Sequence, residues 1–326
     1  MAQLIKLQDY VSRYETDLYR YPSQFVRLKK QQWEKMKLHW ESGDTFASLE
    51  KEEVEEKEKP SVTNKFMSFF KKKDDGGPAE SEFLNQKDDD EIEIEMSSHS
   101  DISTEEELKK HFLDSIFGFQ LRWASSTISE KSYVDNSYYY DERLKYLLQR
   151  FPDNTLVLYY PVLKIKNAPV ELEVVLITPT GIWCLSFLEF EDGTAYIGSG
   201  DRFWEKKWGE TETRVLNPLI SLRRMERIIQ QIVEYAGIEL PVHKAVISRN
   251  GYIDYPQAPA GYRFIDKRMH ESWFNQQRSI RSPIKSVQLK AAKVILDFCQ
   301  TTSFKRMHYQ HETLKEWNQA AEEDSQ

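Results

Sequence analysis

The chain has 326 residues, of which 13% are aromatic and 30% are charged, and its formal net charge is −8. This length is sufficient for two domains or for one domain with appended segments. No run of about 18 apolar residues indicates a membrane span, and charges interrupt each apolar stretch near the N-terminus, which argues against a signal peptide.

Cysteine content and charge distribution narrow the class of protein further. Cys184 and Cys299 are too few for a disulfide framework, so we expect a reducing compartment, the cytoplasm. The segment Glu50–Leu108 has 20 acidic and 8 basic residues, a net charge of −12, whereas Arg202–Gln310 has 19 basic and 10 acidic residues, a net charge of +9. This asymmetry predicts an acidic tether attached to a basic domain.

Residues 1–43 are predicted to be helical. Apolar and aromatic residues recur there at helical spacing. Pro22 is expected to break the region into two helices, the second of which ends near Gly43. The many Tyr and Trp side chains predict packing against either the main domain or a protein partner.

Residues 44–105 are predicted to form a disordered acidic linker, because their few apolar residues cannot offset the entropy of folding. The island NKFMSFFKKK at 64–73 is either a motif that docks on a membrane surface or a partner, or a chance cluster. The block DDDEIEIEM at 88–96 alternates acids with isoleucine, so it either adds to a sheet as an edge strand or stays solvated.

Residues 106–310 are predicted to form an α/β domain, followed by a tail at 311–326. A helix at 136–151 precedes a meander of strands with period-two patterning. A second helix follows, with Asn217 as its N-cap, Pro218 at its first position and Gly237 as its terminator. A strand at 242–249 and a helix from Ser286 complete the order. This order predicts a mixed sheet flanked by helices.

From about Asn136 to Phe274 the chain resembles the nuclease-related domain, NERD, of the PD-(D/E)XK nuclease superfamily. The resemblance rests on the helix DERLKYLL, the strand pair ELEVVLITPTGIWCLSF, Trp204 in the following hairpin and the helix NPLISLRRMERIIQQI. It implies a restriction-endonuclease-like mixed sheet, and in active members it implies metal-dependent cleavage of nucleic acid.

The resemblance also implies where the catalytic residues would stand. Active members have an acidic residue eight positions before the glycine of the turn, and a carboxylate and a lysine five and seven positions after it. Here the glycine is Gly181, and the three positions are Glu173, Ser186 and Leu188. Glu142 of the first helix is a candidate second carboxylate. Carboxylates hold the cation that activates water, and the lysine offsets negative charge.

Because Ser186 and Leu188 carry no charge, we expect Glu173 and Glu142 to be vestiges, with no bound metal and no cofactor. A metal-dependent nuclease with a displaced site is the alternative, and it would use Mg²⁺ or Mn²⁺. Such a site would have to recruit Glu189 or Glu191. Both share parity with Phe187, so they face away from Ser186 unless a bulge intervenes.

Basic residues interleaved with aromatic ones are the remaining functional signal. They predict a face that binds nucleic acid by attracting phosphates and stacking bases, although an ordinary solvated surface has the same composition. The candidate binding residues are Arg202, Trp204, Lys206, Lys207, Arg223, Arg224 and Arg227.

Three interpretations follow, in order of preference. The first is a catalytically inactive NERD protein that binds DNA or RNA. The second is an adaptor that recruits a protein partner through residues 1–43. The third is the nuclease with a displaced metal site.

Overall fold

The computed structural model describes residues 1–42, 102–165 and 168–305, and the chain forms two compact units. One unit comprises Met1–Val26 and Gln120–Gln326, and the other comprises Arg27–Phe119. The predictions of a disordered linker, of the Phe/Lys island and of the C-terminal tail fall largely or wholly outside the described residues. None of the described helices is both long and apolar enough to cross a membrane.

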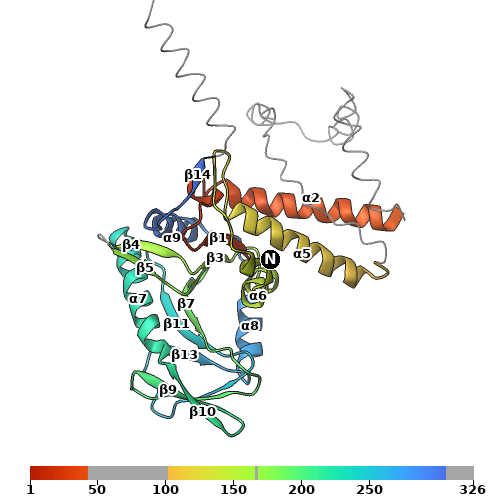
Figure 1. Ribbon diagram of the computed structural model, residues 1–326. Helices are drawn as coiled ribbons and strands as arrows, with labels where there is room; N and C mark the ends of the chain where they lie inside the picture. The colour runs from red at the N-terminus through yellow and green to blue at the C-terminus, as the bar shows by residue number, and fades with distance from the viewer. Residues whose placement is uncertain (43–101, 166–167, 306–326) are drawn as a thin grey trace, which may run out of the picture. The chain divides into compact units, whose positions relative to one another are not determined.

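The first unit is built on a six-stranded mixed sheet (Figure 1). Its strands in spatial order are β1 (Gln3–Leu7), β3 (Leu156–Tyr159), β6 (Val174–Thr178), β7 (Gly181–Phe187), β11 (Val242–Ile247) and β13 (Tyr262–Ile265). The β3–β6–β7 pairs are antiparallel, and the β1–β3, β7–β11 and β11–β13 pairs are parallel. The predicted mixed sheet is therefore confirmed.

Helices cover both faces of this sheet. On one side α7 (Pro218–Tyr235) packs on β7 and β11, and α9 (Ser286–Asp297) packs on β6 and α7. The other side carries α6 (Glu142–Arg150) and α8 (His270–Arg278) (Figure 1). The start of α7 agrees with the prediction, because the Asn217 side chain accepts a hydrogen bond from the Leu219 amide and Pro218 is the first helical residue.

The same unit contains a second sheet, which has four strands. Its spatial order is β10 (Thr211–Leu216), β9 (Phe203–Trp208), β8 (Ala195–Ile197) and β12 (Tyr252–Asp254). Two smaller pairs are β4 (Val162–Ile165) with β5 (Ala168–Glu171), and β2 (Glu130–Lys131) with β14 (Phe304–Lys305). The predicted meander is thus divided between two sheets and a hairpin.

The helical prediction for residues 1–43 is wrong at its beginning. Residues Gln3–Leu7 form β1, a fully buried edge strand that pairs with β3, and only Arg13–Thr16 is helical before Tyr21. The next helix, α2, spans Tyr21–Ser42. Residues 3–7 form a strand because β3 provides partners for their backbone hydrogen-bonding groups. The local spacing of apolar residues cannot reveal this distant partner.

Two further elements differ from the sequence prediction. The predicted helix at 136–151 is a 3₁₀ turn, η1 (Asn136–Tyr140), followed by α6. The predicted meander opens with two separate strands, β3 and β4, which are divided at Tyr160, whose φ of 48° lies in the left-handed region before Pro161. This backbone reversal sends β4 out of the main sheet.

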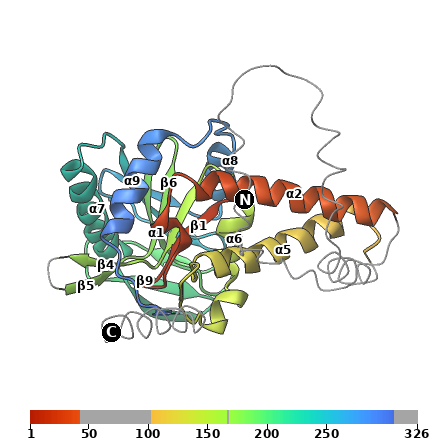
Figure 2. The ribbon, with the colours of Figure 1, turned by 90° about the horizontal axis from the view of Figure 1, so that it is seen from above.

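The second unit consists of the distal part of α2 and most of α5 (Glu105–Trp123), which lie side by side in Figure 2. Trp33 packs against Phe112 with ring centroids 5.2 Å apart. The indole of Trp40 donates a 2.9 Å hydrogen bond to the carbonyl of Ile102. Aromatic side chains of α2 are thus used within this unit.

Candidate functional site

Ser186 and Leu188, which stand where the resemblance implies a carboxylate and a lysine, are both buried. Ser186 lies near the end of the central strand β7 and is 4% exposed, and Leu188 immediately follows the strand and is 6% exposed. The Leu188 amide donates a 2.8 Å hydrogen bond to the carbonyl of Ile247. Neither side chain can supply a ligand charge or a cation at this edge of the sheet.

The two candidate vestigial carboxylates lie on different elements and have different environments. Glu173 directly precedes β6, and its carboxylate accepts a hydrogen bond from the hydroxyl of Ser221 on α7. Glu142 is the exposed first residue of α6. Glu142 lines a cavity to which Glu173 does not contribute. In the described part of the chain, no three acidic, His or Cys side chains converge on a possible cation position.

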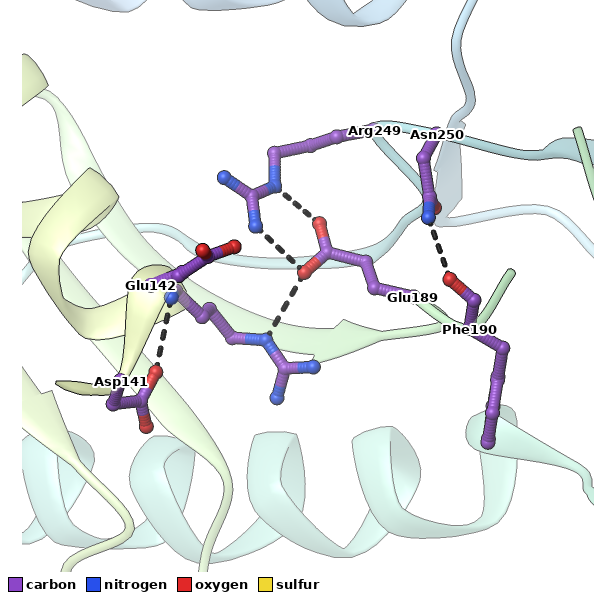
Figure 3. A pocket seen from close by; sticks show the side chains of 7 residues that line it. Asp141, Glu142, Glu189, Phe190, Arg249 and Asn250 are labelled. Carbon is purple, nitrogen blue, oxygen red and sulfur yellow. Dashed lines mark hydrogen bonds and ion pairs between the residues drawn. The ribbon is translucent and has the colours of Figure 1, made fainter. Parts of the chain in front are cut away.

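This cavity has a volume of about 500 Å³ and lies where the N-terminus of α6 meets the ends of β7 and β11 (Figure 3). Its lining residues are Asp141, Glu142, Arg143, Glu189, Phe190, Arg249 and Asn250. Asp141 is the N-cap of α6 and accepts hydrogen bonds from two helix amides and from the Tyr159 hydroxyl. Its carboxylate is therefore engaged in positioning α6.

Glu189 lines the cavity and contacts both Arg143 and Arg249, the second of which is labelled beside it in Figure 3. Arg249 contacts the Glu189 carboxylate through Nε and through Nη2, the latter at 2.9 Å, and Arg143 Nε is 3.2 Å from Glu189 Oε2. Burial opposes ionisation of Glu189, but the hydrogen bonds and charges of Arg249 and Arg143 outweigh it and hold the pKa of this carboxyl below its usual range. Glu189 is thus an ionised structural anion.

Aromatic rings hold both arginines in place. The Arg143 guanidinium lies 4.9 Å from the ring centre of Phe187, and Arg143 Nη1 donates a 3.0 Å hydrogen bond to the Tyr160 hydroxyl. Arg249 lies 4.3 Å from the ring centre of Tyr146. Such cation–π contacts orient the guanidinium groups on the α6 side of the sheet.

The predicted basic face is only partly available to a ligand. Trp204 is fully buried, and its indole donates a 3.0 Å hydrogen bond to the carbonyl of Ser199, so it offers no ring face for stacking. Lys206 is paired with Glu191 at 2.6 Å, and Lys207 is paired with Glu212 at 2.9 Å.

The exposed arginines among the candidates are Arg202, Arg223, Arg224 and Arg227, and the last three lie on α7. Arg224 donates a hydrogen bond to the carbonyl of Glu171.

The sequence did not predict the cluster of Glu189, Arg143 and Arg249, here called the Glu189 cluster. Glu189 lies on the same side as Phe187, as their shared parity predicts, because Arg143 contacts both side chains. No sequence signal links Glu189 to Arg249, because the two residues are 60 positions apart in the chain. Arg249 lies just after the end of β11. Only the parallel pairing of β7 with β11 brings the ends of these strands together.

Comparison with known proteins agrees with the resemblance. Residues 110–248, less than half of the chain, match the family model of the nuclease-related domain. This confirms the predicted relationship, although the matched region begins before Asn136 and ends before Phe274.

A Geobacillus stearothermophilus protein named RNA 2',3'-cyclic phosphodiesterase is 36% identical over 124 residues, which cover 37% of this chain and 36% of that protein. The chain therefore spans about a third of the length of this relative. No solved structure matches the chain.

Proposed function

We propose, from the premise that residues 110–248 form a nuclease-related domain, that this protein is a catalytically inactive domain of that kind that binds nucleic acid. The observation that carries the proposal is the state of the carboxylates around the former site. Glu189 is neutralised by two arginines, and Ser186 and Leu188 are buried and uncharged.

The residues present do not fit the divalent cation that the family implies. Mg²⁺ and Mn²⁺ are held by one or two carboxylates together with water and substrate phosphate oxygens. Glu173 is hydrogen-bonded to Ser221 and is not among the residues that line the cavity, whereas Glu142 is. Recruiting Glu189 would require breaking its contacts with both guanidinium groups, which would leave two cations beside the metal. We therefore derive no metal-assisted step for this protein.

Binding of nucleic acid is proposed to use the exposed arginines of α7, Arg223, Arg224 and Arg227. Arg202 is added to them because its carbonyl accepts a hydrogen bond from the amide of Asn217, the N-cap of α7. Guanidinium groups bind phosphate oxygens without sequence preference, and counterion release makes such binding depend steeply on salt. Lys206 and Lys207 would contribute less, because each already has an acidic partner. The name of the Geobacillus relative favours RNA as the first probe.

The structure provides less support for the adaptor. Aromatic residues near the N-terminus that suggested a partner are packed within the first unit, where Tyr14, Tyr21 and Phe25 surround Trp123. This packing accounts for much of the aromatic content without a second protein.

Cleavage and binding measured in parallel test the proposal. The full chain is incubated with single- and double-stranded RNA and DNA and with Mg²⁺ or Mn²⁺, and we expect no cleavage but salt-sensitive gel retardation. The double variant Arg223→Gln/Arg227→Gln should weaken binding and flatten the salt dependence by about one unit of slope per lost phosphate contact.

The matched control is Arg150→Gln/Arg278→Gln, which removes the same charge from exposed positions on α6 and α8. It should bind as the wild type does. Metal-dependent cleavage that is lost in Glu173→Ala would refute catalytic inactivity. Equal binding by wild type and the α7 variant would refute the α7 surface, and absence of any binding would refute the function.

A further inference from the structure

Among the described residues, the outer edge of β10 is an open sheet edge. β10 is the terminal strand of the four-stranded sheet and has β9 on its other side. Its side chains are exposed except for Val215, which is half-buried, and the β9–β10 hairpin projects at the periphery of the unit in Figure 1. No strand within the described residues pairs with this edge. Such an edge presents backbone N–H and C=O groups to a further strand.

The turn between β9 and β10 determines which backbone groups point outward. Trp208 and Thr211 are paired directly across the two-residue turn, and a closing pair of this kind exchanges backbone hydrogen bonds. Bonded and non-bonded pairs alternate along an antiparallel ladder. Thr213 is therefore bonded to β9, whereas Glu212 and Arg214 direct their N–H and C=O groups to the free edge.

The side chains on the solvent face of the hairpin alternate in charge. Glu212 lies opposite Lys207 of β9, and Arg214 lies opposite Glu205. The Glu212 carboxylate is 2.9 Å from Lys207 Nζ, although the Glu212 side chain remains 68% exposed. These residues share one face because cross-strand partners and alternate residues of a strand point the same way. In one cross-strand pair the acidic residue is on β10 and the basic residue on β9, and in the other pair the basic residue is on β10 and the acidic residue on β9.

We propose that the edge of β10 pairs with β10 of a second copy of this chain, antiparallel about Thr213. In this register Glu212 lies opposite Arg214 of the second copy, and both residues have outward-directed backbone groups that can bond. A row across the four strands then reads Lys207, Glu212, Arg214 of the second copy and Glu205 of the second copy. Its charges alternate throughout, and so do those of the symmetry-related row.

The same charges disfavour neighbouring registers. A shift of the pairing would place Glu212 opposite Glu212 or Arg214 opposite Arg214 of the second copy, and like charges directly opposite each other destabilise a sheet. The charges of Glu212 and Arg214 therefore favour a second copy of this chain as the partner and the register centred on Thr213. The pairing joins two four-stranded sheets into one continuous sheet, and it requires neither nucleic acid nor the cavity around Glu189.

Charge reversal at the two positions tests the proposal in the full-length chain. Glu212→Arg places arginine opposite arginine in both rows, and Arg214→Glu places glutamate opposite glutamate. Each variant alone should self-associate at least tenfold more weakly than wild type in sedimentation analysis across a concentration series. An equimolar mixture of the two variants restores opposite charges across the interface, so it should associate at least tenfold more tightly than either alone. This recovery also shows that both variants are folded.

Amide hydrogen exchange gives a second readout. The amides of Glu212 and Arg214 should gain protection as protein concentration rises, whereas that of Thr213 should be protected at all concentrations. A wild-type chain that stays monomeric, or a dimer that both charge reversals leave intact, overturns the proposal. Protection of Glu212 and Arg214 that is independent of concentration also overturns it, because another segment of the same chain, such as 88–96, would then occupy the edge.

Discussion

Replacing Glu189 with glutamine removes the charge between Arg143 and Arg249 while preserving side-chain shape. A hydrogen bond to a charged group contributes about 1.5–3 kcal/mol, and removal of one partner from a fully buried ion pair costs about 3–5 kcal/mol. The Glu189 side chain is only 8% exposed, but those of Arg143 and Arg249 are 24% and 26% exposed. Because water screens part of their charge, we expect Glu189→Gln to lower the free energy of unfolding by about 2 kcal/mol.

The pH dependence of this loss separates an ion pair from simple packing. The pKa of Glu189 is depressed in the folded state, so its stabilising contribution is present above the unfolded-state pKa and is lost as pH falls through the folded-state value. The difference in free energy of unfolding between wild type and Glu189→Gln should therefore be largest near neutral pH and shrink below about pH 4. Thermal unfolding should show a fall in Tm of about 4–8 °C at pH 7.

Glu191→Gln is the matched control, because Glu191 is an exposed glutamate two residues along the chain that pairs with Lys206. It should leave Tm unchanged within error. If Glu189→Gln is as stable as wild type at pH 7, the arginines do not hold this carboxylate in solution. Glu189 would then be available as a ligand, and the displaced metal site would become the better interpretation.

Three further outcomes follow from the packing. Trp204→Ala should cost about 3–5 kcal/mol in urea unfolding because Trp204 is fully buried, whereas the half-exposed Trp208 should tolerate the same change. Burial and the charge of Arg249 lower the pKa of His270 against the opposing effect of two glutamates, so NMR titration should place it below 6.5, and Arg249→Gln should raise it. Gly251→Ala should lower Tm, because its Cβ would lie 2.5 Å from a main-chain carbonyl oxygen.

Local sequence signals predicted α7 well. Its N-cap and its proline are adjacent in the sequence, and its apolar residues Leu219, Leu222, Met225, Ile229 and Ile232 are buried at helical spacing. The turn at Gly237 also agrees, because this glycine has a φ of 64° directly after the C-cap. Capping and helical periodicity are decided by neighbours along the chain, so one sequence suffices to identify them.

Features that depend on distant residues could not be predicted in the same way. The strand Gln3–Leu7 contains Lys6, whose burial is possible because its ammonium group contacts Glu15, Tyr10 and Thr301. The last of these partners is 295 residues away. Similarly, Trp204 looked like a stacking residue, but Tyr255 and Phe264 from the later part of the chain cover it. Residue type indicated the possible chemistry, and tertiary packing decided which side chains remain available for it.

The Glu189 cluster offers a physical account of how this fold is held together at the sheet edge that carries Ser186 and Leu188. In a metal-dependent nuclease a divalent cation draws together carboxylates from separate elements. Here two guanidinium groups bind one carboxylate from separate elements: Arg143 from α6 and Arg249 from the end of β11 both contact Glu189, which follows β7. Their charge is permanent. Replacement of Ser186 and Leu188 by charged residues would therefore leave these cations in place, and the edge would remain organised around an ion pair.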